Sequence, residues 1–221
     1  MHNPTDFFLL AFPALLSIIN PLGGAFIFLG ATESLSEELR RDVARWVAIH
    51  SFLILNASLW IGAYVLGFFG ISLPVLRVAG GIVIALTAWK ILYAGDEASQ
   101  HHPVNIADPK DASRVAFFPL TMPVTAGPGT ISVAIALGSN RPRGAGHLAI
   151  FALEATIVTV LLSAIVYGLY RYADRLSRFI GTNGTNIILR LTGFLLFCIG
   201  IQVAWTGAAE LLTSVLHEAR S

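Results

Sequence analysis

The stretch Pro119-Leu120-Thr121-Met122-Pro123-Val124-Thr125-Ala126-Gly127-Pro128-Gly129-Thr130 decides how the rest of this sequence can fold. It lies in an apolar segment from about Val115 to Leu137, which is long enough to cross a bilayer as a helix. Three prolines and two glycines interrupt the segment, and proline removes a backbone donor and clashes with the preceding turn. Open backbone groups are tolerated at membrane depth only where protein or a water-lined cavity satisfies them. The stretch therefore predicts a broken transmembrane helix that forms half of a substrate site.

The composition is that of a membrane protein. Of the 221 residues, 55% are hydrophobic and 12% are charged, and the mean hydropathy is +0.73, whereas a soluble domain carries about 25% charged residues. The net charge of +1 excludes the concentrated basic surface of a nucleic-acid-binding protein. The single cysteine, Cys198, lies in an apolar run, so we predict neither a disulfide nor a metal site. The N-terminus lacks the features of a cleaved signal peptide, so we expect the first apolar segment to remain as a span.

Six apolar segments predict an all-α transmembrane fold, because a span needs about 20 mainly apolar residues. The segments run approximately from Phe7 to Leu29, Val47 to Phe69, Ser72 to Tyr93, Val115 to Leu137, His147 to Tyr170 and Ile187 to Thr213. Three of them precede the longest polar connection and three follow it. We predict one polytopic domain over residues 1–221, with half-repeats 1–95 and 115–221 joined by a cytoplasmic loop, 96–114.

The distribution of basic residues predicts the orientation, because cytoplasmic connections are enriched in Lys and Arg. Ten basic residues flank the connections after the first, third and fifth spans: Arg40, Arg41, Arg45, Lys90, Lys110, Arg114, Arg171, Arg175, Arg178 and Arg190. Four lie on the opposite side: Arg77, Arg141, Arg143 and Arg220. Both termini are therefore expected on the periplasmic side.

Two echoes between the halves predict an internal repeat. Phe12-Pro13 precedes Asn20-Pro21-Leu22-Gly23-Gly24 in the first span, and Phe118-Pro119 precedes Gly127-Pro128-Gly129-Thr130 in the fourth. An offset of 106 residues aligns Gly23 with Gly129, whereas an offset of 107 aligns Pro21 with Pro128, so the register stays open.

The second echo pairs Leu76-Arg77-Val78-Ala79-Gly80, at the start of the third span, with Leu189-Arg190-Leu191-Thr192-Gly193, at the start of the sixth. Three spans are an odd number, so the second half must enter the membrane from the opposite side. The prediction is a 3+3 inverted-topology repeat with discontinuous helices 1 and 4. In transporters of this kind, paired Gly/Pro-interrupted spans mark the substrate site near the bilayer midplane.

The residues at the two breaks are the candidate substrate site. Half-helix N-termini suit a carboxylate, and unwound carbonyls and hydroxyls suit a cation, so a zwitterionic amino acid could be held without a charged side chain. The candidates are Asn20, Pro21, Gly23, Gly24, Thr121, Thr125, Gly127, Gly129 and Thr130. Structural alternatives remain open: the threonines could bond freed carbonyls, the glycines could permit tight helix packing, and Asn20 could bond across a helix interface.

Three charged residues are candidates for coupling or gating. Glu154 is an isolated acid in the fifth span and a candidate proton or cation carrier, although a structural ion pair is preferred, with Arg77 as one partner by topology. Arg77 and Arg190 occupy equivalent places at opposite membrane faces. They could gate an alternating-access cycle or serve as snorkelling anchors.

These motifs also resemble a known family. Asn20-Pro21-Leu22-Gly23, Pro119-Leu120-Thr121-Met122-Pro123, Ala126-Gly127-Pro128-Gly129-Thr130-Ile131 and the paired Arg-x-x-Gly starts are similar to the MarC family of integral membrane proteins, over the whole chain. The resemblance implies six spans in the bacterial inner membrane and a relationship to the SnatA amino-acid transporters and the LysE-type exporters. For SnatA-like members it implies cation-coupled movement of small neutral amino acids.

We therefore expect a secondary transporter, not an enzyme, that works by alternating access around the broken helices. No span contains a His-Glu-x-x-His or Gly-x-Ser-x-Gly pattern, and no P-loop is present. The expected partners are a small-molecule substrate and the lipid bilayer, without nucleic acid, and Na⁺ and H⁺ are the candidate coupling ions. The sequence leaves open a homo-oligomer. The alternatives are a non-transporting assembly subunit and an exporter of other small metabolites.

Overall fold

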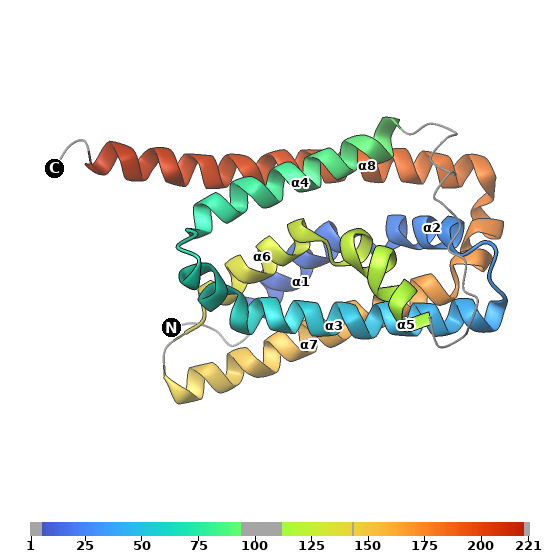
Figure 1. The fold of residues 1–221 in the computed structure, drawn as a ribbon, viewed down its shortest axis with the longest axis horizontal. Helices are drawn as coiled ribbons and strands as arrows, with labels where there is room; N and C mark the ends of the chain where they lie inside the picture. Colours follow the sequence, from blue (N-terminus) through green and yellow to red (C-terminus); the bar gives the residue numbers. More distant parts are fainter. Residues whose placement is uncertain (1–5, 94–111, 143, 219–221) are drawn as a thin grey trace.

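A computed structural model describes residues 6–93, 112–142 and 144–218, and these residues form helices and no strand (Figure 1). In chain order the helices are α1 (Asp6–Ile19), α2 (Pro21–Ala31), α3 (Glu37–Phe68), α4 (Leu73–Tyr93), α5 (Ala112–Val115), the π-helix η3 (Ala116–Thr125), α6 (Pro128–Ser139), α7 (Ala145–Arg171) and α8 (Ala173–Glu218). Most of the predicted loop 96–114 lies outside the described residues, as do three residues of the charge count, Lys110, Arg143 and Arg220.

The predicted all-α membrane fold is confirmed. Five described segments are long and apolar enough to cross a membrane: Phe7–Ala31, Glu37–Phe68, Leu73–Leu92, Ala145–Arg171 and Gly184–His217. The bent pair Ala112–Thr125 and Pro128–Ser139, whose parts differ in direction by 69°, makes up to a sixth span. Successive spans run back and forth along the molecule, so α1 begins at the end where α8 finishes (Figure 1). Within α8 the chain turns at Gly181, which has a φ of 77°.

The long helices form two pairs with half-helices between them. The α4–α8 pair lies on one side of the molecule and the α3–α7 pair on the other (Figure 1). Between the pairs, α6 contacts both α3 and α4, and α2 contacts both α7 and α8. The two half-helices begin near the middle of the molecule and run to opposite ends (Figure 1).

Glycines bring the backbones of α4 and α8 into direct contact. A β-carbon added at Gly81 would lie 2.6 Å from the carbonyl oxygen of Gly200. One added at Gly200 would lie 2.5 Å from the amide nitrogen of Ala85. Small residues permit this close approach between membrane helices, where the attraction is mainly van der Waals packing. Because the obstructing atoms belong to backbone, the pair forms a stiff unit.

This contact predicts that Gly200→Ala destabilises the protein by about 1–3 kcal/mol, because the added methyl group must push the two backbones apart. Gly168→Ala in α7 is the matched control, since a β-carbon there meets nothing within 4 Å. It should leave stability unchanged or raise it by up to about 1 kcal/mol through helix propensity. Thermal unfolding of the purified variants in detergent checks this, and equal melting temperatures would contradict it.

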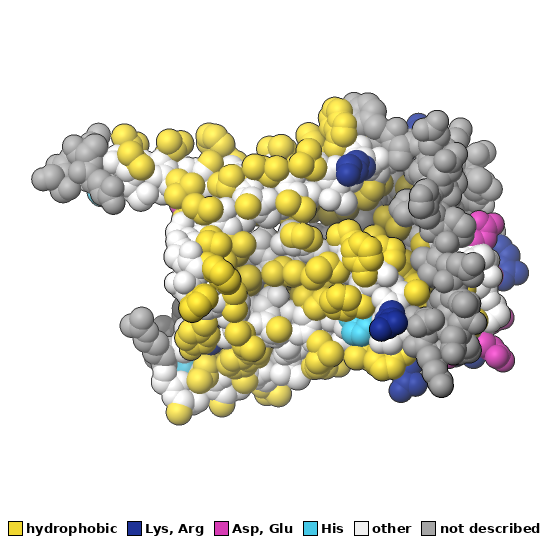
Figure 2. Space-filling view, viewed as in Figure 1, with side chains coloured by type: hydrophobic (Ala, Val, Ile, Leu, Met, Phe, Trp, Pro, Cys, Tyr) yellow, Lys and Arg dark blue, Asp and Glu magenta, His cyan; other side chains and the backbone are white. Residues whose placement is uncertain are grey.

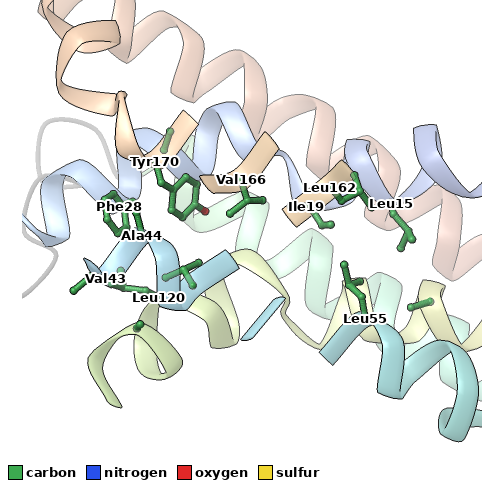
Figure 3. Close-up of a cluster of buried hydrophobic side chains, with 14 of the residues drawn as sticks. Leu15, Ile19, Phe28, Val43, Ala44, Leu55, Leu120, Leu162, Val166 and Tyr170 are labelled. Atoms are coloured by element: carbon green, nitrogen blue, oxygen red, sulfur yellow. The ribbon is translucent and has the colours of Figure 1, made fainter. Parts of the chain in front are cut away.

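The opposite pair surrounds the main apolar core. Leu15 and Ile19 of α1 are buried against Leu55 of α3 and Leu162 of α7 (Figure 3). Alongside these contacts, the amide nitrogen Nδ2 of Asn56 donates to the Thr159 hydroxyl at 3.0 Å and links α3 to α7. The α1 half of the first span is therefore held by the α3–α7 pair.

Charged side chains gather at the end of the molecule where α3 begins (Figure 2). There the hydroxyl of Ser36 caps α3 by accepting from the Leu39 amide at 3.3 Å. The Arg40 guanidinium reaches back to the end of α2, and its Nη2 donates to the carbonyl oxygens of Thr32 at 3.1 Å and of Leu35 at 3.4 Å. The connection between the first two spans is thus tied to the start of α3.

Candidate functional site

The first helix break is a single residue, Asn20. It has φ 45° and ψ 63°, the left-handed conformation, and Pro21 follows as the first residue of α2. Proline disfavours the right-handed α region for the preceding residue, and asparagine is one of the few residues that tolerate the left-handed one. The side-chain oxygen of Asn20 accepts from the Gly23 amide at 3.4 Å, and its carbonyl accepts from the Gly24 amide at 2.9 Å. Asn20 therefore interrupts the helix and caps its continuation.

The break predicts different outcomes for two substitutions of Asn20. Asn20→Gly keeps the left-handed conformation accessible and should cost only a few tenths of a kcal/mol for the lost cap. Asn20→Ala loses the same cap but, unlike the glycine variant, keeps a β-carbon in the left-handed region without the local side-chain hydrogen bond that lets asparagine adopt it, so it should cost about 1–2 kcal/mol more than Asn20→Gly. Unfolding in denaturant measures the difference, and an alanine variant as stable as the glycine variant would contradict this account of the break.

The second break is longer and centres on two X-Pro steps. Phe118 and Met122, which precede Pro119 and Pro123, adopt extended dihedral angles inside η3, as the steric effect of proline on its predecessor requires. The hydroxyl of Thr121 donates to the Ala116 carbonyl at 2.7 Å, and that of Thr125 donates to the Leu120 carbonyl at 2.8 Å. Both threonines therefore satisfy freed carbonyls, the structural alternative considered for them from the sequence.

The N-terminus of α6 has no side-chain cap. Its N-cap is Gly127, which has no side chain, and its first residue is Pro128, which has no amide hydrogen. The first helical hydrogen bond runs from the Ile131 amide to the Gly127 carbonyl at 3.0 Å. The amides of Gly129 and Thr130 precede that bond, so helix geometry gives them no acceptor within α6. They present two donors and the positive end of the helix dipole at the break.

Both breaks line one cavity of about 680 Å³. Five of the nine candidate substrate residues line it: Asn20, Gly24, Gly127, Gly129 and Thr130. The cavity extends between α4 and α8 toward the charged end of the molecule, where its lining includes Glu33, Arg40, Lys90, Asp174 and Arg190. Within the described residues, the structure thus connects the two interrupted spans through one space.

The other four candidates lie behind the wall of this cavity. Pro21 is buried at the start of α2. Gly23 packs against α8, where an added β-carbon would lie 2.6 Å from the Thr192 methyl group. Thr121 and Thr125 are 0% and 1% exposed and serve the backbone of η3. These residues support the shape of the site and do not line the cavity.

The three coupling candidates are spread over the molecule. Arg190 lines the cavity at its charged end. Arg77 forms an ion pair with Glu210 of α8, and the pair suggested between Arg77 and Glu154 stays a prediction. Glu154 is half-buried on α7 and is not among the residues that line the cavity.

Sequence reasoning missed Tyr170, which joins the two breaks from the last turn of α7. Its side chain is fully buried and its ring stacks on Phe28 of α2, with ring centroids 4.8 Å apart (Figure 3). Its hydroxyl lies 2.8 Å from that of Thr125, and a β-carbon at Gly24 would collide with it. In the sequence Tyr170 stands beside Arg171 at the end of an apolar run, which is typical of an interfacial anchor and gives no sign of this role.

The Tyr170–Thr125 bond predicts unequal costs for its two partners. A hydroxyl has one hydrogen to donate, and Thr125 gives its own to the Leu120 carbonyl, so Tyr170 must donate to Thr125. Tyr170→Phe loses one bond, at about 0.5–1.5 kcal/mol. Thr125→Val also strands the buried Tyr170 donor and should cost more, about 1–3 kcal/mol for that donor alone.

Thermal unfolding of both variants checks the order. Tyr167→Phe is the control, because its hydroxyl accepts from Arg171 at an exposed position and its loss should change stability little. A Tyr170→Phe variant less stable than Thr125→Val would reverse the assigned donor.

Each half-helix also contacts the last long helix of the other half of the sequence. Gly23 of α2 meets Thr192 of α8, as described above. In the same way Gly129 of α6 meets α4, where an added β-carbon would lie 3.4 Å from the Gly80 carbonyl oxygen. Gly80 in turn packs on Ser132 of α6: a β-carbon added at Gly80 would lie 2.6 Å from the β-carbon of Ser132. Gly23 and Gly129 correspond at the offset of 106 residues, and Thr192 and Gly80 lie at neighbouring positions of the second echo.

Comparison with known proteins gives consistent results. A family model described as "MarC family integral membrane protein" matches residues 5–212. Inner membrane protein MarC of Citrobacter koseri is 31% identical over 203 residues, covering 90% of this chain and 92% of that protein. The protein of the same name from Salmonella paratyphi A is 32% identical over 205 residues, with the same coverage of both chains. No solved structure matches this chain.

Proposed function

Because the chain belongs to the MarC family of integral membrane proteins, we propose that it is a secondary transporter of the inner membrane that carries small neutral amino acids by alternating access. The names of its relatives state the membrane and no substrate. The proposal therefore depends on the chemistry of the cavity, and on the resemblance to transporting members of the family.

The observation that carries the proposal is the cavity that both interrupted spans line. A break in a transmembrane helix leaves polar backbone groups that must be satisfied, and a protein that needed only to pack would gain nothing from placing two of them around one space. The volume of about 680 Å³ falls within the range of roughly 300–1,000 Å³ that is usual for small-molecule sites.

The lining suits a zwitterion. The uncapped start of α6 offers the amides of Gly129 and Thr130 to a carboxylate, in the manner of helix N-termini that bind anions. Asn20 and the unwound segment before Gly127 offer oxygen acceptors for an ammonium group or for a coupling cation. Na⁺ and H⁺ remain the candidates for coupling, and no catalytic chemistry is proposed.

The paired contacts of α2 with α8 and of α6 with α4 support a 3+3 inverted repeat. The two half-helices run in opposite directions from the middle of the molecule (Figure 1), as halves related by a twofold axis in the membrane plane would. If the charged end of the cavity is cytoplasmic, as the basic residues predict, this conformation is open to the cytoplasm and both termini are periplasmic.

The proposal predicts saturable transport that depends on Thr130. Purified protein in proteoliposomes should take up labelled glycine, alanine, serine or threonine and exchange it in counterflow, and an imposed Na⁺ gradient tests the coupling ion. Thr130→Val keeps the side-chain size but removes a hydroxyl at the cavity wall. It should raise the half-saturating concentration roughly 3- to 10-fold, the effect of one lost hydrogen bond.

Thr156→Val is the matched control, because Thr156 is exposed on α7 and its hydroxyl already donates to the Ala152 carbonyl at 2.8 Å. Its transport should equal that of the unchanged protein. Absence of saturable uptake of all four amino acids by the unchanged, folded protein would contradict the proposal. That result would favour an assembly subunit or an exporter of other small metabolites.

A further inference from the structure

The face of α8 that points away from α4 carries a regular stripe. Its residues follow one another at alternating spacings of four and three: Leu191, Leu195, Cys198, Gln202, Trp205 and Ala209. We refer to these six residues as the heptad stripe, since the spacing is that of a left-handed coiled coil. The opposite face of α8 carries Gly193, Gly200 and Gly207, which are buried against α4.

Five of the six residues of the heptad stripe are exposed in the single chain, and Ala209 is half-buried. Leu191, Leu195 and Trp205 are 58%, 54% and 62% exposed, and Cys198 and Gln202 are also exposed. Apolar side chains on such a face are ordinary contacts with lipid and need no partner. The exception is Gln202, whose carboxamide is polar.

The depth of Gln202 follows from the charges on α8. Arg190 and Glu210 are 20 residues apart, a helix length of about 30 Å, which matches the hydrocarbon thickness of a bilayer. Charged side chains avoid that layer, so the two residues mark its faces on α8. Gln202 lies between them, eight residues before Glu210, and therefore faces hydrocarbon.

The carboxamide of Gln202 makes no side-chain hydrogen bond to the described part of the chain. Only its backbone carbonyl is used, accepting from the Thr206 hydroxyl at 2.9 Å. A polar group transferred to an apolar medium without a hydrogen-bond partner is strongly unfavourable, and Gln is one of the residues that bond across membrane helices. The exposed amide therefore requires a partner that carries both a donor and an acceptor.

We propose that this partner is a second copy of the same chain, and that two α8 helices pack in parallel through the heptad stripe. Two copies share one orientation in the membrane, so their α8 helices are parallel when related by a twofold axis along the membrane normal. Such an axis brings each stripe residue against its equivalent. The Gln202 carboxamides, each a donor and an acceptor, then bond to each other, as single polar residues do at core positions of coiled coils.

An open groove continues this face of α8 from the membrane layer past Glu210. It runs from Gln202 past Thr206 and Ala209 to Thr213, Ser214 and His217. Gly207 packs at the start of α4, with an added β-carbon 2.5 Å from the Pro74 carbonyl oxygen, so the last turns of α8 pass beyond that helix. The polar groups of this extension can meet those of the second copy in water.

Cys198 allows a direct test, because it is the only cysteine in the chain and lies on the stripe. In a parallel, in-register pair the two Cys198 residues face each other across the seam, within reach of a disulfide. Oxidation in native membranes should give a covalent dimer of the unchanged protein. Cys198→Ser should give none, and Val160→Cys in the Cys198→Ser background, exposed on α7 away from α8, is the control for random collision.

Gln202→Leu tests the polar contact itself and leaves a lipid-compatible surface, so the chain should fold. Single-molecule photobleaching in liposomes measures the association constant of the dimer. In the Gln202→Leu variant this constant should fall about 3- to 30-fold, the range for one interhelical polar contact in membranes. Thr206→Val, whose hydroxyl bonds within its own helix, should leave it unchanged. A monomer at all protein densities, or Cys198 cross-linking no stronger than that of Val160→Cys, would overturn the proposal. Neither result depends on the transported substrate.

Discussion

The constraint on which this structure depends is that every backbone polar group placed in the membrane must find a partner. Two of the spans are interrupted, and the freed backbone groups find their hydrogen-bond partners in a different way at each break. At Asn20 one side chain caps the next helix, and the helix resumes at once. At η3 the hydroxyls of Thr121 and Thr125 take up freed carbonyls, while the start of α6 stays uncapped beside the cavity. The second break therefore leaves more backbone donors without an acceptor in their own helix.

The two helix pairs make these breaks possible, because an interrupted helix needs rigid neighbours. The glycine contact between α4 and α8 and the apolar core between α3 and α7 give two such frames. The half-helices α2 and α6 each touch both frames. Tyr170 completes the arrangement, since it reaches from α7 to both breaks and fills the space that Gly24 leaves open.

Much of the fold could be predicted from the sequence, because hydropathy and proline act locally. The spans, the breaks before Pro21 and in the stretch Pro119 to Thr130, and the family all follow from the order of residues. The site could be predicted only in part. Pattern alone could not decide whether Thr121 faces a cavity or a carbonyl, because both need the same hydroxyl. Side-chain partners on different helices could not be predicted. The Arg77–Glu210 pair and the Tyr170–Thr125 bond join residues that are distant in sequence, and both depend on the rotation of each helix about its axis.

The hydrogen bonds of Arg40 determine which part of the first span can move. Its guanidinium, in the first turn of α3, bonds the carbonyls of Thr32 and Leu35, which directly follow α2, so this end of α2 is fixed to α3. The other end meets α1 at one residue, Asn20, around whose two dihedral angles the direction of the helix can change. The direction of the first span can therefore change at Asn20 while α2 stays in place. A change in the direction of α1 would then move the α3–α7 pair as well, because Leu15 and Ile19 are packed against Leu55 and Leu162.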